Sequence, residues 1–141
     1  MYLDTAVLVK LLVRETDSAF YVSLVEGQPA WSSQLILTEC LSALLRKERE
    51  GTIDAAHRRR AWRQVTTDAA AYRLSLVPVT GSLIERANAI LEVCHPGVAV
   101  RTLDALHIAS AERCQSWPLC TNDRRMRAAA SILGLPLSPL P

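Results

Sequence analysis

Residues 1–12 read MYLDTAVLVKLL, and this stretch decides the fold. A short apolar run passes directly into a segment whose apolar positions are too dense for a surface helix. That pattern is typical of a buried strand followed by a helix packed on a sheet. Asp4 lies at the junction. An ionised carboxylate removed from water costs several kcal/mol or more unless it is paired, hydrogen-bonded or metal-bound. We therefore expect a partner for Asp4 at the end of the first strand.

The same step from strand to helix recurs along the chain. We expect further strands at residues 30–33, 76–79 and 119–122, each followed by a helix, with residues 135–141 as a candidate edge strand. The alternation predicts an α/β fold, a three-layer α/β/α sandwich with a central, mostly parallel sheet of four to five strands. Ligands of such folds bind beyond the carboxyl ends of the strands, where Asp4 falls.

Helix ends carry local signals of their own. Gly27 and Gly51 follow apolar-periodic segments and are expected to close two helices. Thr52 is the expected cap of the long arginine-rich helix that comes next, and Thr80 or Ser82 the cap of the helix after the third strand.

The size and composition of the chain indicate a globular protein. At 141 residues, of which 50% are hydrophobic, it is long enough to bury a full core, and we expect one domain over residues 1–141. No stretch has the roughly 18 uninterrupted apolar residues of a membrane span, and the start lacks a secretory signal. We expect a soluble, cytoplasmic protein with no membrane partner.

The basic residues are almost all arginines. Fourteen arginines stand against two lysines, with clusters in HRRRAWR (57–63) and DRRMR (123–127), although the net charge is only +2. Arginine suits phosphate because its planar fork matches the phosphate oxygens. Solvated helix faces explain the clusters equally well, so charge alone leaves the partner open.

Asp4, Glu39 and Asp104 are each embedded in apolar sequence, and Asp123 joins them by its place directly after the expected strand at 119–122. The three aspartates fall where helices are expected to begin, and capping of free backbone N–H groups is one explanation for them. Glu39 lies inside its helix, where the alternative is a buried salt bridge, for instance to Arg46.

Taken together, the four acids favour a metal site. Oxygen ligands gathered at one end of a sheet suit a hard divalent cation, Mg²⁺ or Mn²⁺. The cluster needs a cation because like charges repel. A metal held by carboxylates near arginines is suited to hydrolysing a phosphodiester, because the metal activates water and offsets negative charge on the phosphate.

Four motifs in order carry a family resemblance. They are YLDTAVLVKLL at 2–12, S-x-x-x-x-x-E at 33–39 with ALLRK at 43–47, LDALHIASA at 103–111, and TNDRRM at 121–126. The chain resembles PIN-domain ribonucleases of the VapC toxin type over nearly its whole length.

The resemblance implies a PIN fold and an Mg²⁺- or Mn²⁺-dependent endoribonuclease that hydrolyses RNA, acting as the toxin of a type II toxin–antitoxin system. The implied partners are the RNA substrate and a cognate VapB-like antitoxin, with a homodimer as the expected assembly. The implied catalytic residues are Asp4, Glu39, Asp104 and Asp123. The three aspartates are assigned to the metal, and Glu39 to binding through water or to orienting the attacking water.

Neighbouring residues receive supporting roles in this interpretation. Hydroxyls expected to orient the ligands by hydrogen bonds are those of Thr5, Ser33 and Thr121. Candidates for RNA backbone contact are Arg46 and the arginines of 57–63 and 123–127, with Arg46, Arg124 and Arg125 assigned first. His107 lies one turn after Asp104 and is interpreted as a packed core histidine in preference to a site residue.

Other classes of protein share parts of this sequence pattern. A PIN-fold RNA- or protein-binding module without cleavage activity, or a PIN nuclease in RNA processing outside a toxin pair, would share the same motifs. A haloacid-dehalogenase-type phosphotransferase needs a second Asp two residues after the first, where this chain has Ala6. A receiver domain needs adjacent acids and a late lysine, and no lysine follows Lys47.

Overall fold

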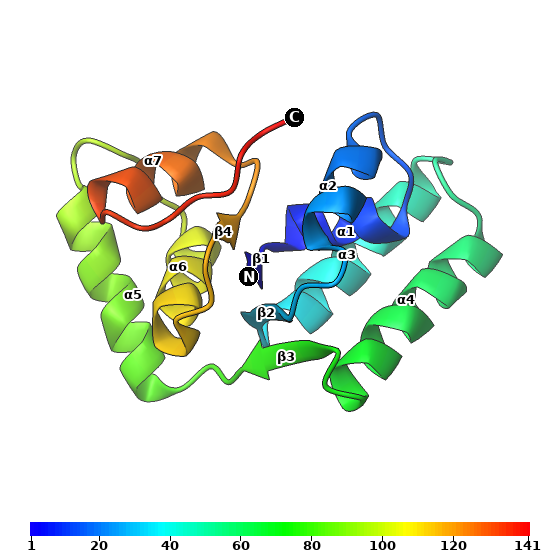
Figure 1. The fold of residues 1–141 in the computed structure, drawn as a ribbon, viewed down its shortest axis with the longest axis horizontal. Coiled ribbons are helices and arrows are strands. Elements are labelled where there is room, and N and C mark those ends of the chain that lie inside the picture. Colours follow the sequence, from blue (N-terminus) through cyan, green and yellow to red (C-terminus); the bar gives the residue numbers. More distant parts are fainter.

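A four-stranded sheet stands at the centre of the computed structural model, which describes residues 1–141 (Figure 1). The strand order is β3-β2-β1-β4, and every pair is parallel. The strands are β1 (Tyr2–Leu3), β2 (Ala30–Ser33), β3 (Leu74–Val77) and β4 (Leu119–Cys120). Beyond them, an isolated parallel bridge joins Leu119 to Leu137, where the candidate edge strand was expected.

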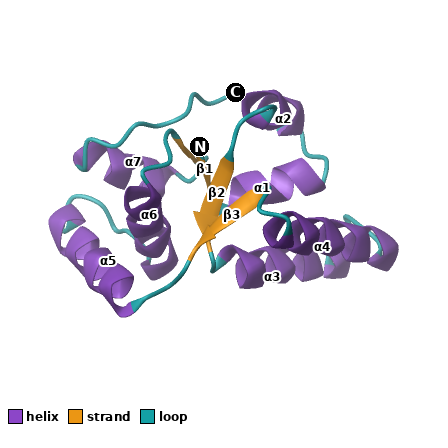
Figure 2. Cartoon of the chain, turned by 60° about the horizontal axis from the view of Figure 1, so that its bottom comes forward, coloured by secondary structure: helices purple, strands orange, loops and turns teal.

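Helices cover both faces of this sheet (Figure 2). One layer consists of α1 (Thr5–Leu12), α2 (Ser18–Val25), α3 (Ile36–Arg49) and α4 (Ala55–Ala70). The other consists of α5 (Gly81–Cys94), α6 (Thr102–Cys114) and α7 (Arg124–Ile132). The predicted three-layer α/β/α sandwich with a parallel sheet is confirmed. None of the helices combines the length and the apolar character needed to cross a membrane.

Side chains of the strands alternate between the two layers. Tyr2 pairs in register with Leu119, and both side chains belong to the core beneath α5, α6 and α7. Leu3 pairs with Cys120, and these face α1 and α2. The period of two therefore sends neighbouring residues of β1 and β4 into apolar cores on opposite faces of the sheet.

Several helices end or begin at the residues that the sequence predicts. Gly27 and Gly51 have φ values of +71° and +73°, a left-handed conformation that glycine adopts without strain. The Thr80 hydroxyl accepts a hydrogen bond from the Leu83 N–H and caps α5.

The cap of α4 differs from the expectation. Asp54, not Thr52, begins this helix, and its carboxylate accepts from the His57 N–H at 2.6 Å. Ile53 is only 8% exposed and packs in the core between α1, α3 and α4. Because Ile53 must turn inward, the helix starts two residues later than expected.

Two strands also have different bounds. β3 begins at Leu74 and ends at Val77, earlier than the expected 76–79, because Pro78 has no N–H to continue the ladder. β4 ends at Cys120, so Thr121 and Asn122 form the loop into α7. This loop lies at the carboxyl end of the sheet.

Arg127 ties the last segment of the chain to this loop. Its guanidinium donates to the backbone oxygens of Thr121 and Ser138, each at 3.0 Å. Ser138 in turn donates its backbone N–H to Leu119 O at 3.1 Å. One side chain therefore holds the end of β4 and the segment beside it in place.

Replacing Arg127 by alanine should lower the free energy of unfolding by about 1–3 kcal/mol, because two charge-assisted hydrogen bonds are lost. Arg124→Ala is the matched control, since Arg124 is exposed on the same helix, and should change stability by no more than about 0.5 kcal/mol. Urea unfolding of the two variants measures both values. Equal effects would show that Arg127 does not hold the segment.

Candidate active site

The side chain of Asp4 is almost fully enclosed at the end of β1. It is 4% exposed, and each carboxylate oxygen has a hydrogen-bond donor. Oδ1 accepts from the Val7 N–H at 2.8 Å, which starts α1, and Oδ2 accepts from the Thr121 hydroxyl. The partner that the sequence called for is therefore the backbone of α1 together with the loop after β4.

Asp123 and Asp104 also lie at helix starts. Asp123 Oδ1 accepts from the N–H groups of Arg125 and Met126 at 2.7 and 3.0 Å and caps α7. Asp104 Oδ2 accepts from the Arg101 N–H at 3.3 Å in the first turn of α6. In each aspartate the other carboxylate oxygen has no hydrogen-bond partner within the protein. Capping therefore occupies only one oxygen of each.

Glu39 is held by side chains instead of by a helix end. Its Oε2 accepts from the Thr5 hydroxyl at 2.8 Å and is 2.7 Å from His107 Nε2, while Oε1 has no partner within the protein. The alternative salt bridge to Arg46 is wrong: Arg46 lies 3.9 Å from Glu50 on the exposed side of α3. The Thr5 and His107 contacts turn Glu39 inward.

All four acids line one cleft. Its volume is about 470 Å³, and its walls come from α1, α3, α6 and the loop into α7. Basic residues on the same walls are Lys10, Arg46, Lys47 and Arg101. The fold therefore brings together carboxylates that are as far apart in the chain as residues 4 and 123.

The surroundings of the acids shift their pKa values in different directions. Burial raises the pKa of Asp4 and of Asp104, and the nearby charge of Asp123 raises both further, against the hydrogen bonds that each accepts. Burial would also raise the pKa of Glu39, but the hydrogen bonds from His107 and Thr5 outweigh it and leave that pKa below its ordinary value. Glu39 is thus the acid whose surroundings favour the charged form.

The donor set fits a hard divalent cation. Asp104, Asp123 and Glu39 each keep one oxygen without a hydrogen-bond partner, and carboxylate oxygens are the ligands that Mg²⁺ and Mn²⁺ prefer. As the side chains stand, no three His, Cys, Asp or Glu residues come close enough to enclose an ion directly. The acids stand apart as like charges do, and Mg²⁺ commonly keeps several waters between itself and its ligands.

The hydroxyl residues expected to support the acids behave differently from one another. Thr5 and Thr121 donate to Glu39 and Asp4. Ser33 does not reach an acid, because its Oγ accepts from the Leu35 N–H at 3.3 Å where the chain turns from β2 into α3. That backbone N–H has no helical partner, so it takes the nearest oxygen.

Only one of the three arginines assigned first to RNA contact lines the cleft. Arg46 lines the cleft, whereas Arg124 and Arg125 do not. The charge of Arg125 nevertheless counteracts the effect of burial on the pKa of Asp104, so it lies within electrostatic range of that acid. Their contact with RNA stays a prediction.

Sequence reasoning missed the two lysines on the cleft wall. Lys10 and Lys47 are 10% and 14% exposed, and both contact Glu15, at 2.7 and 2.6 Å. Lys10 also contacts Asp17 at 2.7 Å, so the group joins α1, the start of α2 and the end of α3. Two lysines in a chain with fourteen arginines were the available signal.

The comparisons with known proteins agree with this geometry. Residues 1–132 match the PIN domain. The chain belongs to the PIN-domain family. It is 36% identical over 138 residues to Ribonuclease VapC46 of Mycobacterium tuberculosis, covering 96% of this chain and 93% of that protein.

A solved structure shares the PIN fold. The crystal structure of VapBC2 from Rickettsia felis bound to a DNA fragment from their promoter matches with a TM-score of 0.62 at 17% identity, over 97% of this chain and 96% of that one. The resemblance to VapC-type PIN ribonucleases is therefore confirmed, and PIN ribonucleases are typically metal-dependent.

Asp104→Asn should stabilise the metal-free protein at neutral pH, on the order of 3 °C in melting temperature. Because its folded-state pKa is raised, wild-type Asp104 contributes most when protonated and loses that contribution as the pH rises through the folded pKa. The gain in Asp104→Asn should therefore shrink as the pH falls toward 4. Mn²⁺ should stabilise the wild type more than the variant.

Asp54→Asn is the control, because Asp54 also caps a helix but has a lowered pKa and lies outside the cleft. Its Mn²⁺ response should equal that of the wild type. Melting curves from pH 4 to 8 test both statements. A gain in Asp104→Asn that is constant with pH would contradict the repulsion.

Proposed function

We propose that this chain is a metal-dependent endoribonuclease that hydrolyses phosphodiester bonds in RNA, and that it acts as the toxin of a type II toxin–antitoxin pair, with residues 1–141 working as one domain. The observation that carries the proposal is the convergence of Asp4, Glu39, Asp104 and Asp123 on one cleft at the carboxyl end of the sheet. The 36% identity to Ribonuclease VapC46 supports the choice of RNA as substrate.

Three aspartates are suited to hold Mg²⁺ or Mn²⁺ in this cleft. Asp104 and Asp123 each keep one oxygen free of hydrogen bonds, and Asp4 lies at the floor with its orientation fixed by Val7 and Thr121. The bound ion would lower the pKa of a water molecule and offset negative charge on the phosphate. The caps hold the three carboxylates in place, so little reorganisation is needed when the substrate arrives.

Glu39 has a different role in the proposal. Its Oε2 is occupied by Thr5 and His107, so Oε1 is the oxygen available to the cleft. A glutamate whose pKa is lowered stays ionised at neutral pH and accepts a hydrogen bond from water. We assign Glu39 to orienting the attacking water and accepting its proton.

The path of the RNA continues from the cleft along α3. A second groove of about 550 Å³ shares Thr5, Glu39, Ala43 and Arg46 with the first cleft. Arg49 lines its far part, and both arginines are exposed. Exposed guanidinium groups beside a catalytic cleft are suited to the phosphates of a single strand.

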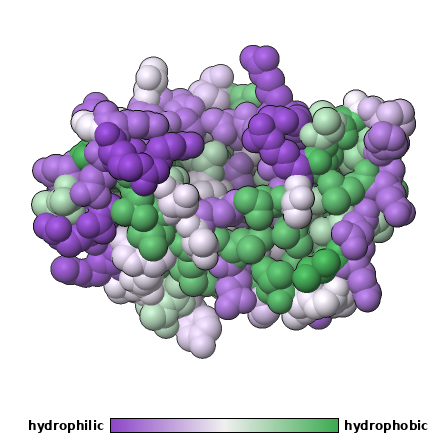
Figure 3. Space-filling view, turned by 180° about the vertical axis from the view of Figure 1, so that it is seen from behind, coloured by the Kyte–Doolittle hydropathy of each residue, from purple (hydrophilic) through white to green (hydrophobic).

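A VapB-like antitoxin is the proposed protein partner, with a homodimer as the proposed assembly. The fold of the VapBC2 structure supports the first of these. Exposed apolar side chains offer contact area, and Figure 3 shows apolar residues gathered in patches on the back of the molecule between polar ones. The large apolar side chains exposed over the whole surface are Val22, Leu45, Tyr72, Ile84, Val93, Leu103, Ile132 and Leu140.

Cleavage of a mixed RNA pool in the presence of Mn²⁺ tests the activity. Asp123→Asn should lower the rate on the order of 100-fold, because asparagine keeps the cap of α7 but removes the charge facing the cleft. Asp54→Asn, a second helix-cap change, should cleave as the wild type does. RNA binding without cleavage by a folded wild type would favour the non-cleaving binding module, and equal cleavage by Asp123→Asn would remove Asp123 from the site.

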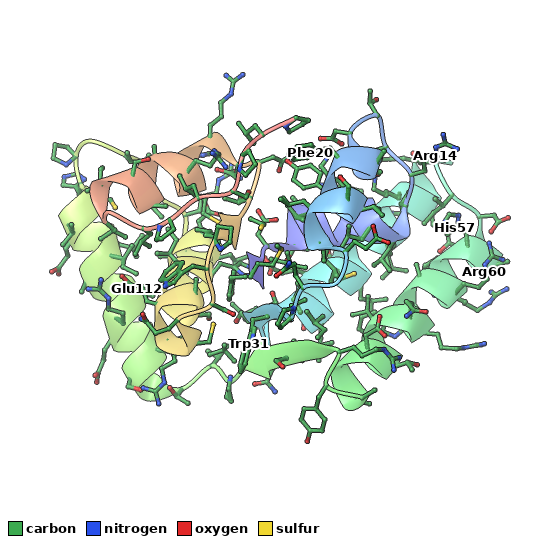
Figure 4. All side chains as sticks on the ribbon, viewed as in Figure 1. Arg14, Phe20, Trp31, His57, Arg60 and Glu112 are labelled. Atoms are coloured by element: carbon green, nitrogen blue, oxygen red, sulfur yellow. The ribbon has the colours of Figure 1, made fainter.

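Arg46→Ala should weaken RNA binding several-fold and reduce the slope of log affinity against log salt by about one, as the loss of one phosphate contact does. Arg60→Ala is the control, because Figure 4 shows Arg60 on α4 at the outer end of the molecule and it lines neither groove. Titration of a labelled RNA strand at several salt concentrations measures both. Equal slopes in the two variants would exclude Arg46 from the RNA path.

A further inference from the structure

A buried chain of hydrogen bonds runs from the core to the cleft. Tyr2 is fully buried in β1, and its hydroxyl lies 2.8 Å from His107 Nδ1 on α6. The other ring nitrogen, Nε2, lies 2.7 Å from Glu39 Oε2 on α3. The rings of Tyr2 and His107 also meet edge to face, with centroids 5.9 Å apart. Three separate elements are joined by these contacts.

The direction of the hydrogen bonds follows from Glu39. An ionised carboxylate oxygen can only accept, so His107 Nε2 carries a proton and donates it in the hydrogen bond to Oε2. In the neutral imidazole Nδ1 then has a free lone pair, and it accepts from the Tyr2 hydroxyl. Thr5 donates to the same oxygen of Glu39. Both donors therefore meet Oε2 and leave Oε1 free.

His107 does more than fill the core. A histidine with only apolar neighbours would leave two nitrogens without partners, whereas here each nitrogen has one and the second partner is a cleft acid. The expectation of a packed core histidine is therefore correct for its burial and incomplete for its contacts. Glu39 on α3 has no helix cap to hold it, unlike the three aspartates.

We propose that His107 is a positioning residue that fixes the rotamer of Glu39, and that Tyr2 acts through it by setting the tautomer of its ring. This inference rests on the proposed ribonuclease function, in which Glu39 orients the attacking water. His107 is 2% exposed at the wall of the cleft, and its role in the reaction is to act through Glu39. The Tyr2 hydroxyl, which lies behind His107 on the side away from Glu39, therefore influences the rate of cleavage across two hydrogen bonds.

The chain contains a matched pair of tyrosines for the test. Tyr21 is also fully buried, but its hydroxyl has no hydrogen-bond partner, and it packs against Leu3 and Val7. Tyr2→Phe and Tyr21→Phe each remove one buried oxygen and nothing else. Only the first interrupts the hydrogen-bond chain to Glu39.

Steady-state cleavage of a defined RNA strand with Mn²⁺ is the first measurement. Tyr2→Phe should lower kcat on the order of 10-fold with KM unchanged, and Tyr21→Phe should leave both unchanged. His107→Gln, which retains an N–H donor near the position of Nε2, should keep more activity than His107→Leu. Equal kcat values for the two tyrosine variants, or for the two His107 variants, would overturn the proposal.

A second measurement needs neither RNA nor metal. Proton-detected ¹⁵N NMR of the imidazoles should show the Nε2–H tautomer for His107 in the wild type and a mixture in Tyr2→Phe. A double-mutant cycle of Tyr2→Phe with Glu39→Gln should show coupling in the free energy of unfolding.

The two measurements separate the inference from the proposed function. A wild type that binds RNA and cleaves none would end the ribonuclease assignment, while a single Nε2–H tautomer and coupled unfolding would still support the positioning of Glu39. Unchanged NMR signals together with additive unfolding free energies would overturn the positioning even in an active enzyme.

Discussion

The buried carboxylate of Asp4 is the contact on which the rest of the structure depends. One oxygen starts α1 through the Val7 N–H, and the other receives the Thr121 hydroxyl from the loop after β4. Its backbone N–H donates to Cys120 O at 3.1 Å, which continues the pairing of β1 with β4. Hydrogen bonds to a charged group contribute about 1.5–3 kcal/mol each and offset part of the cost of burying the carboxylate, whose pKa stays raised. A single side chain thus joins the central strand, the first helix and the last loop.

Helix capping and the acid cleft use the same carboxylate groups. Asp4, Asp104 and Asp123 each give one oxygen to backbone N–H groups, and this fixes the carboxylates in a position where they repel one another. Glu39 is fixed by side-chain donors, which lower its pKa. One cleft therefore holds acids whose surroundings push their pKa values in opposite directions, an arrangement suited to the proposed division between holding a metal and orienting water. The capping explanation of the aspartates is correct, and their metal-binding role stays a prediction.

Signals confined to a few residues predicted much of the fold. The cap at Thr80 and the left-handed Gly27 and Gly51 depend on local backbone chemistry, which the sequence displays directly. The sequence could not show that Asp54, and not Thr52, caps α4. Both residue types cap helices well, and the burial of Ile53 decides between them. Asp4, Glu39 and Asp104 could be recognised by their apolar surroundings, and Asp123 by its place after β4. The contacts of His107, across 105 residues to Tyr2 and 68 to Glu39, depend on packing that no local pattern records.

The pairing of β1 with β4 has a consequence for synthesis. A ribosome delivers β1 and Asp4 well before β4 and Asp123. Until then Asp4 lacks the Thr121 hydroxyl, and β1 lacks one of its two neighbours in the sheet. A growing or prematurely terminated polypeptide therefore has no assembled acid cleft. For a ribonuclease, this order of translation keeps the nascent chain inactive toward the message and the ribosome that are producing it.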